Sequence, residues 1–317
     1  HINSDDPYDL SKSTNRSGIL LADIFKNYKF DFVCILGDRF ERIPIILNAL
    51  LFKKVIVHLH GGEKTEGLID EQVRHMISKS AHIHFVICKE YMNNLKKIGE
   101  KNWRIFNSGS LAIDNIKNIN KINHKKILYN YKINTEKPFC IFTYHPVTLE
   151  FNISIKKQIK NIFRAISKFD YQVIITHPGN EVGSNEIIEL IKKEAIQYKN
   201  KYFIIKSLGY SNLYNLIPNS NFVIGNSSFG IIEVPYFRIP TINIGDRQKG
   251  RFMHESIINC DYSVTSIEKA ILKTQNERFL FKIKKMKYEF GNGNASKKII
   301  DILYKIKINQ KLLRKVL

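Results

Sequence analysis

The sequence predicts an α/β protein with two Rossmann-like lobes, each holding a parallel sheet, and a cleft between the lobes. Short apolar, β-branched runs such as Phe32–Leu36 and Val55–Leu59 are typical of strands that are covered on both faces. These runs alternate with segments of helical periodicity, and the alternation starts afresh near Pro138. A length of 317 residues also suits two cores that are built without disulfides or metals.

The first lobe is expected to span residues 1–125. Its polar start, up to Arg16, is interpreted as loop, and residues 17–28 show the apolar spacing of a helix. A stretch rich in lysine and asparagine, 118–137, is interpreted as the linker to the second lobe. The remaining elements predicted here are strands 32–36, 55–59, 83–88 and 104–107 and helices 43–52, 70–80, 90–98 and 113–116.

Residues 126–294 are expected to form the second lobe. Residues 295–317 have apolar positions on one side and lysines on the other, which predicts one long amphipathic helix. Such a helix could lie on a membrane, but in a two-lobed α/β protein it is better interpreted as a bridge between the lobes. The elements predicted for the second lobe are strands 138–143, 172–176, 202–205, 222–225 and 241–244 and helices 153–169, 185–197, one near Leu213 and one opening at Ser228.

The net charge of +21 raises the question of a polyanionic partner. The lysines and arginines are spread along the chain without a block of five like charges, so neither a nucleic acid nor a membrane is expected as a partner. Cys34, Cys88, Cys140 and Cys260 show no Cys-x-x-Cys spacing, which argues against a zinc site or a disulfide framework and favours a cytoplasmic protein. No apolar run approaches the roughly 20 residues that span a bilayer.

The stretch His58–His75 carries the densest set of candidate catalytic groups. A predicted strand ends there in a glycine-bearing loop with the carboxylates Glu63 and Asp70, and Asp38 follows the neighbouring strand. Ligands of open parallel sheets sit beyond the carboxyl ends of the strands, so these side chains are expected to face the substrate. Arg74, in the helix that follows, is a candidate substrate-binding cation.

In the second lobe, Gly225–Gly230 follows a strand and opens a helix. Its backbone N–H groups and the hydroxyls of Ser227 and Ser228 can therefore cradle an anion, although a turn of this kind is often only a helix cap. Glu233 lies about one helical turn further on, where a carboxylate can accept hydrogen bonds from ribose hydroxyls.

Two further side chains at strand tips are candidate anion-binding groups. Arg247 can form a bidentate pair with a phosphate. His145 precedes a proline, and a lone histidine is usually structural, but facing Asp38 and Glu63 across a cleft it becomes a candidate acid or phosphate partner. His177 ends the next strand in the same way without a charged companion.

A series of motifs resembles the hydrolysing UDP-N-acetylglucosamine 2-epimerases of sialic-acid-type sugar biosynthesis. The match runs from about Asp31 to Ser296. Non-hydrolysing relatives carry a His-x-Glu-Ala-Gly-x-Arg loop where this chain has His58-Leu-His-Gly-Gly-Glu63, so the hydrolysing branch is favoured. The matching motifs are Gly37-Asp-Arg-Phe-Glu41, His60-Gly-Gly-Glu-x-x-Glu-Gly67 with Asp70-Glu-x-x-Arg-His75, His145-Pro-Val-Thr148, Gly225-Asn-Ser-Ser-x-Gly-x-x-Glu233 and Gly245-Asp-Arg-Gln-x-Gly-Arg251.

The resemblance implies a glycosyltransferase-B-type fold, a UDP-sugar substrate and a homo-oligomer that is either a dimer or a tetramer. No motif demands a metal, because the positive groups named above can carry the charge of the diphosphate, so no metal or other cofactor is expected. Family members usually begin with a further strand and a Gly-x-Arg phosphate-binding turn well before the position of Asp31. Either the N-terminal lobe is incomplete, as we expect, or the protein lacks a substrate-binding arginine. The family's Pro-Asn-x-Asp-x-Gly loop stands here as Pro178-Gly-Asn-Glu-Val-Gly183, so contacts near the base or the acetamido group are expected to differ.

The implied reaction converts UDP-N-acetylglucosamine to UDP and free N-acetylmannosamine through a 2-acetamidoglycal, to which water adds. Asp38, Glu63 and Asp70 are expected to share the acid and base roles, while His145 and Arg247 stabilise the leaving phosphates. One alternative is the same reaction on UDP-2,4-diacetamido-2,4,6-trideoxyglucose, which leads to legionaminic-type acids. A glycosyltransferase of the same fold is another. A non-catalytic polyanion binder would leave the carboxylates unexplained.

Overall fold

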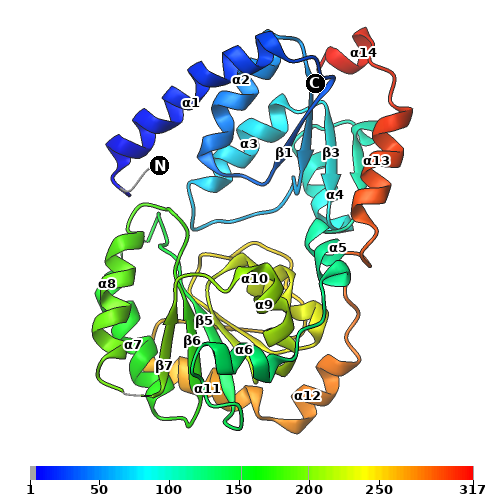
Figure 1. Ribbon diagram of the computed structural model, residues 1–317. Coiled ribbons are helices and arrows are strands. Elements are labelled where there is room, and N and C mark those ends of the chain that lie inside the picture. Colours follow the sequence, from blue (N-terminus) through cyan, green and yellow to red (C-terminus); the bar gives the residue numbers. More distant parts are fainter. Residues whose placement is uncertain (1–4, 151, 199, 317) are drawn as a thin grey trace. The chain divides into compact units, whose positions relative to one another are not determined.

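The computed structural model describes residues 5–150, 152–198 and 200–316 (Figure 1). The chain forms two compact units, of which unit 1 comprises His1–Lys117 with Glu289–Leu317 and unit 2 comprises Asn118–Tyr288. Each unit holds a parallel sheet, which confirms the predicted α/β class. The expected lobes end at 125 and 294, whereas the chain leaves unit 1 after residue 117 and returns to it at residue 289.

Unit 1 is built around parallel strands in the order β1-β2-β3-β4, as far as the described residues show. β2 is buried at every position because helices cover both faces of the sheet, whereas the edge strand β1 is partly exposed. The elements of unit 1 are α1 (Pro7–Asn27), β1 (Phe32–Leu36), α2 (Ile43–Leu51), β2 (Val55–Leu59), α3 (Asp70–Ser80), β3 (Ile83–Val86), α4 (Lys89–Lys97), β4 (Ile105–Asn107), α5 (Leu111–Asn118), α13 (Ala295–Lys305) and α14 (Gln310–Leu313).

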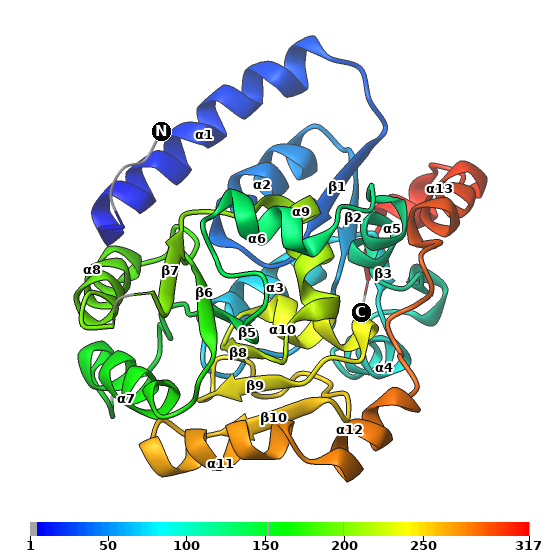
Figure 2. The same ribbon diagram turned by 60° about the horizontal axis from the view of Figure 1, so that its bottom comes forward.

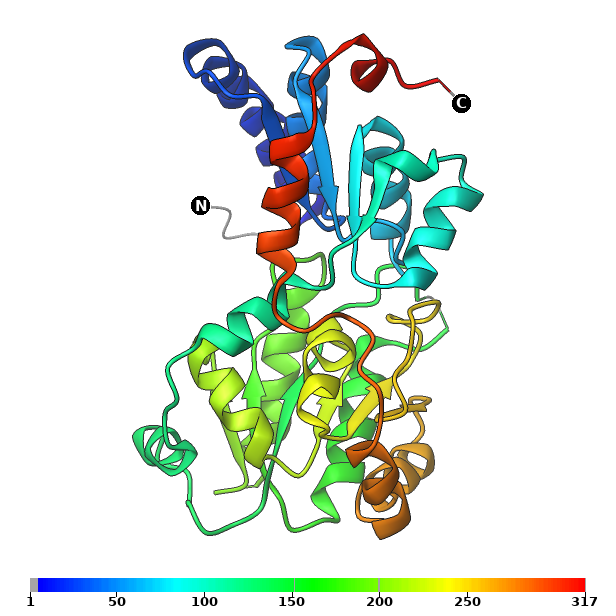
Figure 3. The same cartoon turned by 90° about the vertical axis from the view of Figure 1, so that its right-hand side faces the viewer.

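Helices α1, α2 and α3 cover one face of this sheet, and the C-terminal helices α13 and α14 cover the other (Figure 3). The C-terminal segment is therefore part of the core of unit 1, and its expected role as a bridge stays a prediction. The apolar side chains that pack together include Phe25, Ile46, Ile77, Ile35 and Ile56 on the first face and Ile299, Leu312, Val57 and Phe85 on the second.

Unit 2 has the strand order β10-β9-β8-β5-β6-β7, with all neighbours parallel (Figure 2). The chain runs outward from β5 to β6 and β7, then returns to β8 on the other side of β5. The direction of winding reverses between β5 and β8, and ligands of open α/β sheets bind at such a switch point. The strands of unit 2 are β5 (Phe139–Thr143), β6 (Gln172–Thr176), β7 (Tyr202–Ile205), β8 (Val223–Gly225), β9 (Thr241–Ile244) and β10 (Ile257–Cys260).

Helices α7, α8 and α11 bury one face of the unit 2 sheet, and α9 and α10 lie on the other (Figure 2). The side chains of α7 that enter this core are Ile159, Ile162, Phe163 and Ile166. The helices of unit 2 are α6 (His124–Asn130), α7 (Ile155–Ser167), α8 (Ser184–Ala195), α9 (Gly209–Leu216), α10 (Ser228–Ile232), α11 (Val264–Thr274) and α12 (Glu277–Lys284).

The structure corrects several expected elements. The polar N-terminal stretch is helical from Pro7, because the side chain of Asp6 caps the first turn by accepting a hydrogen bond from the N–H of Tyr8 at 2.9 Å. The expected linker contains α6, which Asn123 caps. The C-terminal segment forms two helices rather than one: α13 ends at Lys305, and α14 begins at Gln310. Within the described residues, none of the helices has the length and apolar composition needed to cross a bilayer.

Candidate active site

The candidate groups of unit 1 lie where β1 and β2 end. Leu36 at the end of β1 pairs with Leu59 at the end of β2, so the turns that follow lie at the same edge of the sheet. After β2, His60 and Gly62 adopt positive φ angles of 64° and 78°. A Cβ on Gly62 would lie 2.3 Å from the carbonyl oxygen of Tyr91, so this tight loop requires glycine.

Arg74 on α3 holds these turns together. Its side chain is buried, and its guanidinium forms ion pairs with Asp38 and Glu71. It also donates to the backbone carbonyl of Glu63 at 2.9 Å and to Oγ1 of Thr65 at 3.0 Å. The expected substrate-binding cation therefore directs these hydrogen bonds to protein groups, and in doing so it fixes the turn after β1 against the loop after β2.

The other candidate carboxylates lie close to this cluster. Glu63 is only 4% exposed, and Nδ1 of His60 donates to its Oε1 at 3.1 Å. Asp70 begins α3, where the positive end of a helix stabilises a carboxylate. The structure thus brings Asp38 and Glu63 together around Arg74 and places Asp70 at the start of the helix that carries this arginine.

In unit 2 the candidate groups lie at the switch point between β5 and β8. A Cβ on Gly225, whose φ is 136°, would lie 1.9 Å from the carbonyl oxygen of Thr143, so glycine allows the two strand ends to meet. The side chain of Asn226 accepts from the N–H of His145 at 2.7 Å and donates to its carbonyl oxygen at 2.8 Å. This reciprocal pair of bonds fixes His145 beside the Gly/Ser turn.

Arg247 joins the loops that follow β9, β5, β8 and β6. Its side chain is 9% exposed, its Nε donates to the carbonyl of Pro146 at 3.2 Å, and its Nη1 donates to the carbonyl of Asn226 at 3.4 Å. Its Nη2 lies 3.0 Å from both carboxylate oxygens of Glu181, which also lies 3.7 Å from Nδ1 of His145. The motifs do not predict a role for Glu181 or Asn226. The available signal is that Asn226 lies inside the matching motif that begins at Gly225, and Glu181 inside the loop Pro178–Gly183 that departs from the family pattern.

The remaining candidates lie around α10. Ser227 is the N-cap residue of this helix and Ser228 is its first residue. Because the helix is a single short turn, the binding of an anion here would depend on the local N–H and hydroxyl groups more than on a helix dipole. Glu233 follows the helix and is half-buried. Burial, and to a lesser extent the charge of Glu233, raises the pKa of Tyr214 and of Tyr288, so both phenols near this carboxylate stay neutral.

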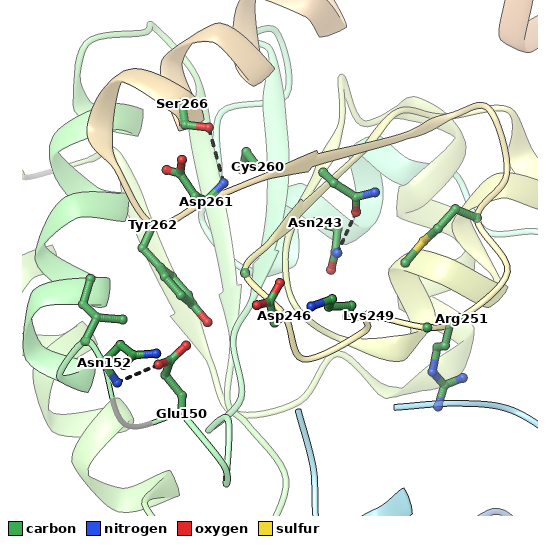
Figure 4. Close-up of a pocket in the computed structure, with 15 residues that line it drawn as sticks. Glu150, Asn152, Asn243, Asp246, Lys249, Arg251, Cys260, Asp261, Tyr262 and Ser266 are labelled. Carbon is green, nitrogen blue, oxygen red and sulfur yellow. Dashed lines mark hydrogen bonds between the residues drawn. The ribbon is translucent and has the colours of Figure 1, made fainter. Parts of the chain in front are cut away.

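A cavity of about 910 Å³ adjoins these loops in unit 2 (Figure 4). Asn243 and Asn259, which are register partners on β9 and β10, line it and share a hydrogen bond of 2.8 Å. The ring of Tyr262 packs on Gly245, where a Cβ would lie 2.2 Å from the ring, and burial raises the pKa of Tyr262 to about 12. The loop that carries Arg247 therefore borders a cavity large enough for part of a sugar nucleotide.

In the part of the chain that the structure describes, no group of three His, Cys, Asp or Glu residues is arranged to hold a metal ion. The expected independence of metals stays a prediction.

Comparison with known proteins identifies the family. The family model described as UDP-N-acetylglucosamine 2-epimerase matches residues 1–304. The chain belongs to this epimerase family. Its relatives include the GDP/UDP-N,N'-diacetylbacillosamine 2-epimerase (hydrolyzing) of Campylobacter jejuni, which is 36% identical over 277 residues, 87% of this chain and 71% of that protein. The UDP-N,N'-diacetylbacillosamine 2-epimerase (hydrolyzing) of Legionella pneumophila is 31% identical over 308 residues, 96% of this chain and 79% of that protein.

A solved structure of the epimerase family shares the fold. The UDP-GlcNAc 2-epimerase of Neisseria meningitidis, bound to UDP-GlcNAc, matches with a TM-score of 0.81 over 96% of this chain and 84% of that chain, at 19% sequence identity. The match confirms the glycosyltransferase-B-type α/β fold that the motifs imply. The protein is an enzyme of the epimerase family, and the roles of its individual residues are predictions that rest on the geometry above.

Proposed function

We propose that the protein is a hydrolysing 2-epimerase that acts on a UDP-linked 2-acetamido sugar. The substrate and one water yield UDP and the free sugar with inverted C2, so that UDP-N-acetylglucosamine gives N-acetylmannosamine. The observation that carries this proposal is the gathering of Asp38 and Glu63 around Arg74 at the carboxyl edge of the unit 1 sheet. Relatives named as hydrolysing epimerases, at 36% and 31% identity, support it.

The proposed reaction has an elimination step and an addition step. A carboxylate of unit 1 removes the C2 proton while the bond from C1 to the diphosphate oxygen breaks, which gives a 2-acetamidoglycal and UDP. The oxygen of water then bonds to C1, and a proton returns to C2 from the opposite face. Two proton transfers on opposite faces require at least two acid or base groups, and Asp38, Glu63 and Asp70 supply them.

Unit 2 is proposed to bind the nucleotide. Ser227, Ser228 and the adjacent N–H groups bind phosphate oxygens, and His145, which Asn226 fixes beside them, stabilises the charge that develops on the departing diphosphate. Arg247, whose guanidinium pairs with Glu181, holds the surrounding loops in place, while Glu233 binds the ribose hydroxyls.

Two sugars are candidate substrates. UDP-N-acetylglucosamine is the simpler one. The diacetamido sugar UDP-2,4-diacetamido-2,4,6-trideoxyglucose is the second candidate, because the names of two relatives specify a diacetylbacillosamine nucleotide. The two substrates differ at C4, where one has a hydroxyl and the other an acetamido group.

Incubation with each nucleotide sugar in heavy water, followed by proton NMR, tests the proposal. We expect UDP and a free sugar of inverted C2 configuration with deuterium at C2, and full activity in excess chelator. A free sugar of unchanged configuration without deuterium would indicate simple hydrolysis. Transfer that requires an added acceptor would indicate a glycosyltransferase, and either outcome would overturn the proposal.

Replacement of Glu63 by Gln tests the carboxylate cluster. The amide keeps the size of the side chain but cannot exchange a proton as an acid or base, so we expect kcat to fall by about 10²- to 10⁴-fold. Glu90→Gln is the control, because Glu90 is an exposed carboxylate of the same unit. Equal turnover by the two variants would remove Glu63 from the mechanism.

A further inference from the structure

We infer that His58 is a positioning residue that fixes the three segments of unit 1 that carry the candidate carboxylates. The inference rests on the proposed function, because it concerns how these carboxylates are placed for proton transfer. His58 lies within β2 and is fully buried, on a strand where both sheet faces are covered and an apolar residue is the usual choice.

The ring of His58 contacts each of the three segments. Its Nε2 lies 2.9 Å from the carbonyl oxygen of Gly37, in the turn after β1. Its Nδ1 lies 3.1 Å from Oγ of Ser78 on α3. A Cβ on Gly61 would lie 2.9 Å from Nδ1, so the backbone of the loop that leads to Glu63 packs directly on the ring.

These partners decide which ring nitrogen carries the hydrogen. The carbonyl of Gly37 can only accept, so Nε2 donates to it, and Nδ1 accepts from the hydroxyl of Ser78. Burial lowers the pKa of His58 to about 3, and the neighbouring His84 adds to this shift. The ring therefore stays neutral near pH 7, and its hydrogen-bond pattern is constant.

The geometry fits positioning rather than proton transfer to substrate. The ring is inaccessible to solvent, and protein groups engage both nitrogens. Arg74 holds Asp38 through its side chain, while His58 holds the backbone of the preceding residue. The two contacts together define where this carboxylate points. A displacement of about 1 Å at a reacting group can lower a rate by about 10²-fold.

His82 offers a matched control within the same unit. It is also buried, and burial is the main reason that its pKa falls to about 4. Its Nδ1 accepts from the N–H of Ile56 at 3.0 Å. Because His82 immediately precedes β3, it lies toward the amino edge of the parallel sheet, away from the edge that carries the carboxylates.

Replacement of His58 by Gln, Asn and Ala gives a graded test. The amide nitrogen of Gln can reach the position of Nε2 and donate to Gly37, whereas that of Asn reaches only the position of Nδ1. We expect His58→Gln to keep kcat within about tenfold of the natural enzyme, and His58→Asn and His58→Ala to lose about 10²-fold. The Kd for UDP should stay within about twofold, because the proposed nucleotide site lies in unit 2.

The His82 variants separate positioning from a loss of stability. His82→Asn and His82→Gln are expected to lower the urea midpoint of unfolding about as much as the His58 variants, with kcat changed by less than about twofold. Equal kcat losses in the His58 and His82 series would overturn the inference. So would a Gln variant no more active than the Asn variant.

A spectroscopic measurement keeps the inference testable if the Asn and Ala variants do not fold. In protein labelled with ¹⁵N-histidine, His58 is expected to show a neutral ring with hydrogen on Nε2 at pH 6 and at pH 8. Hydrogen on Nδ1, or titration in this interval, would overturn the inference. A natural enzyme that turns over neither nucleotide sugar would instead overturn the proposed function, and the ¹⁵N measurement would still test the contacts.

Discussion

At the scale of single residues, the decisive contacts join side chains that lie far apart in the sequence. Arg247 and Glu181 are 66 positions apart, and no local pattern predicts their pairing. By contrast, sequence reasoning predicts that Asp38 and Glu63 lie close together, because the ends of neighbouring parallel strands meet at one edge of a sheet. The sequence does not predict that Arg74 binds the carboxylate of Asp38 and the backbone carbonyl of Glu63 instead of pointing freely toward a ligand.

The role of Arg247 can be tested by Arg247→Lys. Lysine keeps the charge, but its single ammonium group cannot contact the carbonyl oxygens of Pro146 and Asn226 and the carboxylate of Glu181 at the same time, as the planar guanidinium does. We expect the Kd for UDP, measured by calorimetry, to rise by about tenfold or more, since the loops that carry His145 and Asn226 lose guanidinium contacts that fix them. An unchanged Kd would show that only the charge matters.

Arg238→Lys is the matched control for this measurement. Arg238 also lies in unit 2, and its guanidinium donates to carbonyl oxygens of its own turn, those of Pro235 and Tyr236. The Kd for UDP should therefore change by less than about twofold in this variant. A rise similar to that of Arg247→Lys would mean that any loss of an arginine in unit 2 weakens binding.

At the scale of elements, the strands can be predicted from the sequence because each is a short apolar run with β-branched residues. The strands predicted at 32–36, 55–59, 172–176, 202–205 and 241–244 have these bounds in the structure. The sequence pattern does not predict β10, because it is a short edge strand that contains the polar Asn259. The sequence pattern also does not predict the break between α13 and α14, because helical periodicity continues across it. In the structure, Asn309 caps the new helix.

Asp114 is predicted to stabilise the start of α13. Its carboxylate accepts hydrogen bonds from the N–H groups of Ala295 at 2.9 Å and Ser296 at 2.7 Å, and from the hydroxyl of Ser296 at 2.6 Å. Burial raises the pKa of Asp114, but these bonds outweigh it and hold the pKa below its usual value. We expect Asp114→Ala to lower the free energy of unfolding by about 1–2 kcal/mol in urea titrations.

Asp301→Ala provides the comparison for Asp114→Ala, because Asp301 is an exposed carboxylate within α13 itself. It should change the free energy of unfolding by no more than about 0.5 kcal/mol. If both variants are equally stable, the carboxylate of Asp114 does not cap the helix in solution.

At the scale of the whole molecule, unit 1 is assembled from both ends of the chain. Lys315 donates to the carbonyl oxygens of Ser78 and Ala81 at 2.7 Å each and forms an ion pair of 2.8 Å with Glu100. Arg104 donates to the carbonyl of Leu312 at 2.9 Å. The core of unit 1 is therefore complete only once the segment that follows unit 2 in the chain is in place, since α13 and α14 cover one face of its sheet.

Buried histidines in this core are predicted to make folding sensitive to acid. Folding lowers the pKa of His58 to about 3 and that of His82 to about 4, chiefly through burial, from 6.5 for an unperturbed side chain. Below pH 6.5 the unfolded chain binds protons that the folded protein excludes. The free energy of unfolding should therefore decrease as the pH is lowered below 6.5, by up to about 1.4 kcal/mol per pH unit for each histidine. Above pH 6.5 these two groups should not make stability depend on pH.

Urea titrations between pH 7.5 and pH 4.5 measure this slope. The midpoint for the natural protein should fall steadily below about pH 6.5, while His58→Gln and His82→Gln should each lose part of the slope because glutamine does not titrate. The double variant should lose the sum of the two effects, since each pKa shift arises mainly from the burial of its own ring. Identical slopes in all four proteins would mean that neither histidine is held neutral by the fold.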